Sequence, residues 1–267
     1  MPVLTDNDTE LYNFTEEQVK RIRILYASTS NELRNVIEDA INEKITLGSK
    51  NETLATIAIL LTKTQQETDG LLLKIIPAAY NLGIKDTTQR LPRRFQDIEL
   101  GAVHAIQVNA FLSEAALDFG TGLEGAKKSA GQLLSRVFQE QLRDRMLEGK
   151  EKGFGAPKIA QEVLSELKDL GFSTFIRRDG RKMGLRAYAE MLTRTHVIRS
   201  ANEGTIKRAN EVGFTIFEMS DHVGECALCR PYEGKLFDST GKKFNKPPSM
   251  PIHPNCRHKL LVRPELQ

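Results

Sequence analysis

The chain has 267 residues, of which 40% are hydrophobic and 27% charged, as is normal for a soluble globular protein. It has no tryptophan and only 6% aromatic residues, and its net charge of +3 is too small to require a nucleic-acid partner. The N-terminal sequence MPVLTDNDTELYNF lacks the features of a signal peptide, and no apolar run approaches the roughly 20 residues of a membrane span. We therefore expect neither export through such a signal nor a membrane anchor.

The first helix is predicted over residues 14–45, where apolar residues recur at helical spacing. Thr15 with Gln18 three places on has the pattern of a capping box, so we expect Thr15 to be the N-cap. Gly48 follows as a plausible C-cap.

A second helix is predicted over residues 51–76, ending near Pro77, with a pair of helices joined at Gly70 as the alternative. Further helices are predicted over residues 93–120, 126–149 and 156–170. The glycine-rich stretch GTGLEG separates the first two of these, and Gly171 closes the last. Long helices with short links predict an elongated bundle.

The pattern changes after Gly171. Two short strand-like runs flank Asp179-Gly180, which is typical of a hairpin, and a long helix follows that should end at Gly213. The run FTIFEMS is apolar on both faces, which predicts an interior strand, and HKLLV is strand-like too. The predicted fold is therefore mostly α with a small α+β C-terminal domain: an elongated N-terminal helical bundle, residues 1–170, followed by a compact zinc-knuckle-like module, residues 171–267.

The three cysteines of the chain lie within 31 residues near the C-terminus. Cys226 and Cys229 have the spacing of a metal-binding knuckle, and His253 and Cys256 follow after 23 residues. Three thiolates and one imidazole are a complete tetrahedral zinc set with no open position, which indicates a structural rather than a catalytic ion. So few clustered cysteines favour metal over disulfide bonds.

Two alternatives to this ligand set are left open by the sequence. Either His222 or His258 could replace His253 as the fourth ligand, and the cysteines could instead be small buried residues with no metal.

The sequence HPNCRH also resembles part of an HNH-type nuclease site. Only nine residues follow His258, however, and they are strand-like, so there is no room for the helix that such a site needs. We expect a protein that is not an enzyme, with no catalytic residues.

The charge is concentrated at the C-terminal end, with 17 basic against 10 acidic residues from Leu170 onward. A candidate phosphate-contacting face consists of Arg177, Arg178, Arg181, Lys182, Arg194 and Arg199. This face predicts weak, non-specific binding of double-stranded DNA. His196, on an apolar helix face in the same region, is expected to be a core residue.

With these motifs in place, residues 172–264 resemble minor head proteins of tailed bacteriophages, the Mu F-like and minor capsid families. The shared features are Gly180-Arg181, Tyr188-Ala189, Arg194-Thr195, Gly213, Cys226 with Cys229, Gly234-Lys235, and the run from His253-Pro254 to Cys256-Arg257-His258. One departure is His196, where many relatives carry glutamate after the Arg-Thr pair. A role of that glutamate is therefore not carried over.

The resemblance implies a structural virion protein that lies inside the phage head and, during assembly, in the host cytoplasm. Such proteins associate with the portal protein in the procapsid, and in some phages they leave the head with the DNA. The major capsid or scaffold protein is a further expected partner, and we expect the N-terminal helices to carry this association. The alternatives are a zinc-stabilised DNA-binding protein and the HNH-like nuclease.

Overall fold

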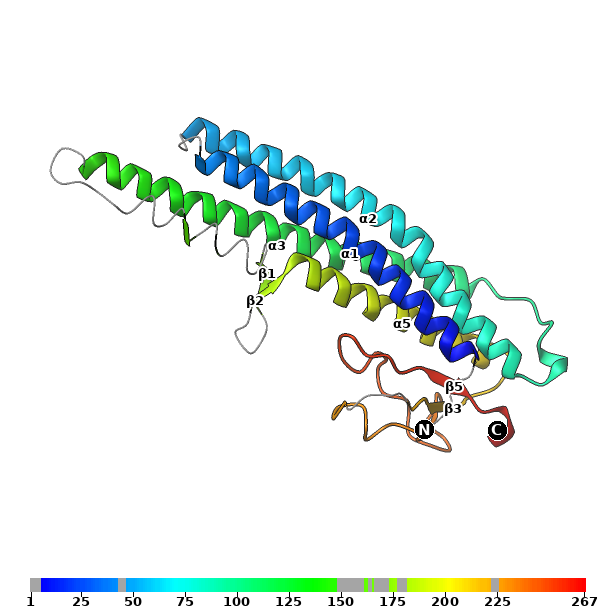
Figure 1. Ribbon diagram of the computed structural model, residues 1–267. Coiled ribbons are helices and arrows are strands. Elements are labelled where there is room, and N and C mark those ends of the chain that lie inside the picture. The colour runs from blue at the N-terminus through cyan, green and yellow to red at the C-terminus, as the bar shows by residue number, and fades with distance from the viewer. Residues whose placement is uncertain are drawn as a thin grey trace. The chain divides into compact units, whose positions relative to one another are not determined.

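The computed structural model describes residues 6–42, 47–147, 161–162, 165, 173–176, 182–221 and 226–267. Within these residues lie four long α-helices (Figure 1): α1 (Asp6–Asn42), α2 (Leu47–Arg90), α3 (Val103–Leu147) and α5 (Leu185–Glu211). Two short 3₁₀ helices accompany them, η1 (Arg93–Phe95) and η2 (Pro264–Leu266). The predicted mostly helical fold with a small C-terminal sheet is confirmed.

The strands form two small antiparallel sheets. Strands β1 (Ser173–Ile176) and β2 (Lys182–Gly184) pair as the predicted hairpin, whose turn lies outside the described residues. In the second sheet, β3 (Ile216–Met219) lies between β4 (Leu236–Asp238) and β5 (Leu260–Val262). Phe217 of β3 is fully buried and pairs with Phe237 on one side and Val262 on the other, so the predicted interior strand is confirmed.

The chain divides into two compact units. Unit 1 contains Met1–Lys20, Gly70–Ala116 and Met191–Gln267, and unit 2 contains Arg21–Asp69 and Leu117–Glu190. Each unit therefore takes residues from both sides of the predicted boundary near Gly171. That boundary and the predicted helix over residues 156–170 lie almost wholly outside the described residues, so the division into 1–170 and 171–267 stays a prediction.

The core of unit 2 is built from apolar and hydroxyl side chains of α1, α2 and α3. Tyr26 is 1% exposed, and its ring centroid lies 6.0 Å from that of Phe119. The Thr68 hydroxyl lies 3.2 Å from the Tyr26 hydroxyl, and those of Thr29 and Thr64 are 2.9 Å apart. Burial raises the pKa of Tyr26 far above its usual range, so the phenol stays neutral in this core.

In unit 1, α2 and α5 approach each other backbone to backbone. A Cβ atom at Gly83 would lie 1.9 Å from the carbonyl oxygen of Ala201, and one at Gly204 would lie 2.3 Å from that of Tyr80. The Thr205 hydroxyl donates a hydrogen bond to the Gly83 carbonyl at 3.3 Å. Only glycine at these two positions permits so close a contact.

A buried ion network joins α5 to the segment between α2 and α3. Arg208 is 1% exposed and donates to the Glu211 carboxylate at 3.1 Å and to the carbonyls of Phe95 and Gln96 at 3.2 and 3.3 Å. Burial acts to raise the pKa of Glu211, but hydrogen bonds from the Gly101 N–H, His104 and Arg208 outweigh it and lower that pKa. Glu211 therefore stays ionised beside the buried arginine.

Three predicted helix boundaries were wrong because tertiary packing overrides local signals. Thr15 is not an N-cap, since α1 begins at Asp6 and the Thr15 hydroxyl donates to the Leu11 carbonyl within the helix at 2.7 Å. Gly48 lies in the first turn of α2 rather than after α1. Helix α3 begins at Val103 rather than at residue 93, because the carbonyls of residues 95 and 96 accept hydrogen bonds from the Arg208 side chain instead of from N–H groups of a helix.

The two predicted helix breaks were also wrong. Helix α2 continues through Gly70 and Pro77, where the buried Ile76 and Tyr80 flank the proline. A proline within a helix costs about 3 kcal/mol, whereas burying one large apolar side chain gains about 1.5–3 kcal/mol, so packing on both sides offsets that cost. Helix α3 likewise runs unbroken through GTGLEG, and a Cβ at Gly122 would lie 2.7 Å from the Tyr188 ring. That glycine permits close packing instead of ending a helix.

Candidate metal centre

The first arm of the centre is the turn that carries Cys226 and Cys229. Its backbone is held by hydrogen bonds from the N–H groups of Cys229 and Arg230 to the Cys226 carbonyl, at 3.1 and 2.9 Å. The Cys229 N–H also bonds to the Cys226 sulfur and lowers the pKa of this thiol, which favours the thiolate that binds metal. Cys229 is fully buried, and burial next to the other sulfurs raises the pKa of its thiol in the absence of a cation.

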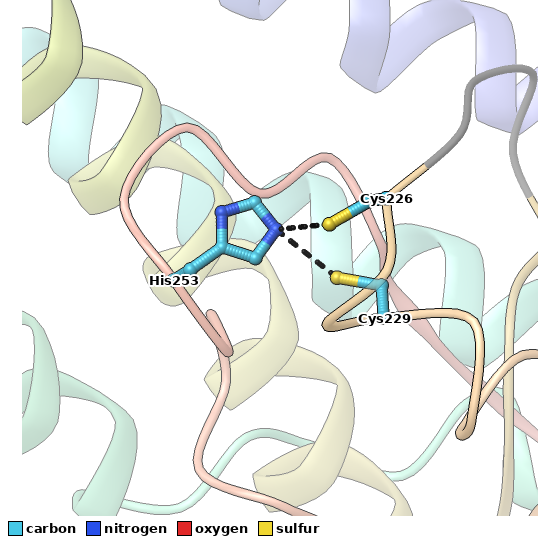
Figure 2. A group of neighbouring side chains, drawn as sticks. All are labelled: Cys226, Cys229 and His253. Carbon is cyan, nitrogen blue, oxygen red and sulfur yellow. Dashed lines mark hydrogen bonds between the residues drawn. The ribbon is translucent and has the colours of Figure 1, made fainter.

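The second arm is the loop that carries His253 and Cys256. Nε2 of His253 lies 3.1 Å from the sulfur of Cys226 and 3.1 Å from that of Cys229, and Figure 2 shows the ring pointing between the two. Nδ1 of the same ring lies 2.7 Å from the Pro254 carbonyl oxygen, which can only accept a hydrogen bond. Nδ1 therefore carries the proton, and Nε2 presents its lone pair to the sulfurs.

His258 is a fifth donor, two residues before β5 begins at Leu260. Its Nδ1 lies 3.5 Å from the Cys256 sulfur, and its Nε2–H donates to the Glu233 carboxylate at 2.8 Å. A carboxylate that orients a ligating histidine in this way is common at metal sites. The side-chain amide of Asn202 in α5 fixes the backbone here, because it donates to the His258 carbonyl at 3.1 Å and accepts from the Leu260 N–H at 2.7 Å.

The five donors form two overlapping sets of three that share Cys229, within the described residues. One set is Cys226, Cys229 and His253, and the other is Cys229, Cys256 and His258; the ligand atoms of each lie within 4.8 Å of one another. These residues are therefore positioned to hold a metal ion. The predicted Cys226, Cys229, His253 and Cys256 are all among them, His258 joins them as the sequence allowed, and His222 lies outside the described residues.

Two of the four distances between neighbouring ligand atoms match those around a tetrahedral ion with soft ligands. Zinc bonds of about 2.3 Å to sulfur and 2.0 Å to nitrogen imply ligand separations of about 3.8 Å between sulfurs and about 3.5 Å between sulfur and nitrogen. The sulfurs of Cys229 and Cys256 are 3.8 Å apart, and the Cys256–His258 distance is 3.5 Å. The two distances from His253 are shorter, at 3.1 Å, and would open slightly around an ion.

The centre is part of a hydrophobic core. Cys229 and Cys256 are buried in one cluster with Phe217, Phe237 and Leu260 of the sheet. Sulfurs in such surroundings are poorly accessible to a substrate, which fits a structural role for the centre. Neither Glu233 nor Asn202 was predicted, because nothing in their sequence spacing marks them as partners of His258.

The predicted phosphate-contacting residues are not brought together as one described face. Arg177, Arg178 and Arg181 lie outside the described residues, and so does the side chain of Lys182. Arg194 makes a two-pronged ion pair with Glu16, with both N–O distances 3.1 Å, and Arg199 pairs with Glu114 and stacks on Phe111. DNA binding by these six residues stays a prediction. His196 is 3% exposed, as expected of a core residue.

Long helices, a small antiparallel sheet and a Cys/His cluster that could hold a metal define a mostly helical class of protein with a candidate metal centre. The model of one family, described as phage minor capsid protein 2, matches residues 4–262. The chain belongs to this phage minor capsid protein family, which supports a structural role in the phage head and a location in the virion. Searches of curated proteins and of solved structures returned no match. Among the described helices, none is both long and apolar enough to cross a membrane.

Proposed function

We propose that this protein is a structural minor head protein of a tailed phage that associates with the portal during procapsid assembly and contacts packaged DNA. The observation that carries the proposal is the family match over residues 4–262, nearly the whole chain. Ejection with the genome is a further part of the proposal, as is the major capsid or scaffold protein as a second partner.

Zinc is the proposed ion of the metal centre. Three thiolates with one imidazole favour zinc over magnesium or calcium, which prefer oxygen ligands. Cys226, Cys229 and Cys256 would supply the sulfurs, and His253 or His258 the nitrogen. Such a set leaves no coordination position for a substrate, so the ion would hold the turn of residues 226–229 against the segment of residues 253–258.

Exposed apolar residues on the helices support a protein partner. In unit 2, large apolar side chains are left exposed on three different helices: Ile24 at 62%, Ile59 at 71% and Leu117 at 70%. Single exposed apolar residues are ordinary, but large ones on several helices of one unit offer anchors for a protein interface. The portal or the inner capsid surface is the partner that the proposed role requires.

The proposed role is tested with the full-length protein in its phage. A particle preparation should contain the protein at a few copies per head, and chemical cross-linking should connect its helices to the portal protein. Ile59→Glu should reduce incorporation severalfold, whereas Gln66→Glu, an exposed polar position on the same helix, should leave it unchanged. Particles that lack the protein, or cross-links that never involve the portal, would contradict the proposal.

A further inference from the structure

All five basic side chains of residues 226–250 are exposed, while both carboxylates of this segment are turned inward. The basic residues are Arg230, Lys235, Lys242, Lys243 and Lys246. Glu233 is bound to His258, and Asp238 is 2% exposed and accepts hydrogen bonds from its own turn. The charges that this segment presents to solvent are therefore predominantly positive, although its formal count includes two acids.

The turn after β4 holds three of these lysines in a defined arrangement. The Asp238 carboxylate accepts hydrogen bonds from the N–H groups of Thr240, Lys242 and Lys243, at 2.8, 3.0 and 2.8 Å, and from the Thr240 hydroxyl at 2.7 Å. Gly241 has a φ of +74°, and a Cβ there would lie 3.3 Å from the stem of Lys246, so this stem crosses the turn. Lys242, Lys243 and Lys246 consequently project from one ordered turn.

These lysines differ from the arginines of α5. Arg194 and Arg199 are each paired with a carboxylate, which offsets their charge. Among the described residues, no carboxylate forms an ion pair with Lys242 or Lys246, and Lys243 donates to the Leu266 carbonyl at 2.7 Å, which leaves its charge in place. The ammonium groups of Lys242, Lys243 and Lys246 therefore present more uncompensated charge to solvent than the two paired arginines do.

We propose that the exposed Lys242, Lys243 and Lys246, which we call the lysine face, bind the phosphate backbone of duplex DNA without sequence preference. This inference rests on the proposed contact with packaged DNA and names the surface that makes it. Lysine ammonium groups act as point charges toward phosphate oxygens. The rings of Tyr232, Phe237 and Phe244 are at least partly buried, so the face lacks an exposed platform for stacking single-stranded bases.

The experiment measures binding of the full-length protein to a fluorescein-labelled 20-base-pair duplex by anisotropy over a salt series. Lys242→Glu combined with Lys246→Glu should lower the salt slope by about 2 and weaken binding at low salt at least tenfold, since each phosphate contact adds about 0.9 to the slope. The control combines Lys20→Glu with Lys74→Glu, which changes the net charge equally at exposed helical positions of the same unit. It should retain most of the affinity and the slope.

Each other outcome has a distinct meaning. Equal losses in the two double variants would overturn the lysine face in favour of net charge alone. The lysine face would also be overturned if Lys242→Glu/Lys246→Glu kept the wild-type salt slope and affinity while the triple variant Arg177→Glu/Arg178→Glu/Arg181→Glu lost DNA binding. That result would favour the predicted arginines, and the proposed DNA contact would survive. A wild-type protein that does not bind the duplex but binds polyglutamate would overturn both the lysine face as a DNA site and the proposed contact with packaged DNA. It would assign the lysine face to an acidic protein partner.

Discussion

In unit 2, three long helices bury whole rows of apolar side chains, whereas in the metal centre short loops converge on three sulfurs and two imidazoles. Loss of one side chain from a helical row leaves many neighbouring contacts in place. Loss of one ligand removes the ion that holds all the loops together. The comparison indicates that the two regions should fail independently, and that the metal centre should fail first.

The largest effect is expected from loss of the metal. Cys229→Ser should release the ion and expose residues 226–262 to protease, because structural zinc contributes about 10 kcal/mol or more to folding of such modules. The circular dichroism of the helices should be mostly retained. Leu228→Ser is the matched control, since Leu228 lies between the two cysteines but is 62% exposed. A folded, reduced protein with no metal by elemental analysis, or a Cys229→Ser protein as protease-resistant as wild type, would contradict the structural ion.

The sequence was sufficient to predict features that depend on local signals. The helix end at Gly213 was predicted correctly because its φ of +85° suits glycine, and so were the hairpin and the interior strand. Cys226, Cys229, His253 and Cys256 could be named because ligand spacing is a local property. Pro77 and the GTGLEG stretch were misjudged because propensity is local, whereas the helix length there is set by packing against distant elements. The partners of His258, Glu233 and Asn202, are 25 and 56 residues away in sequence, which no spacing rule anticipates.

The next largest effect concerns the buried arginine of unit 1. Arg208→Met should destabilise the protein by about 3–5 kcal/mol, because it leaves Glu211 without its arginine and two carbonyls without a donor. Arg186→Met, which removes an arginine that is 61% exposed and lies 3.7 Å from Glu190, should cost at most about 1 kcal/mol. Urea unfolding monitored by circular dichroism measures both. Similar losses in the two variants would show that the buried network contributes no more than a surface ion pair.

Helix packing in unit 1 provides a third test, at two glycines of α2. Gly83→Ala should cost about 3 kcal/mol or more, since the added methyl would collide with the Ala201 carbonyl and force α2 and α5 apart. Gly70→Ala has no atom within 4 Å of the new methyl and should stabilise the helix by about 0.5–1 kcal/mol. Thermal unfolding should shift in opposite directions. A neutral Gly83→Ala would mean that the two backbones are not in contact in solution.

The smallest effect is expected at Asp238, which orders one turn rather than a core. Hydrogen bonds from the Lys243 and Thr240 N–H groups and the Thr240 and Thr215 hydroxyls lower the pKa of this carboxyl well below its usual range. A lowered pKa means that the stabilisation is complete above the unfolded-state value of about 4 and is lost as the pH falls through the folded-state value.

Asp238→Asn replaces one acceptor oxygen by an NH₂ group, so at neutral pH it should speed amide exchange at Lys242 and Lys243 while the helices stay protected. Wild type should approach this exchange pattern only in strong acid, after correction for intrinsic rates. Because acid also protonates the metal ligands, Asp238→Asn is compared with wild type at each pH. An unchanged exchange rate in the variant would show that the turn, unlike the metal centre, does not depend on its single anchoring side chain.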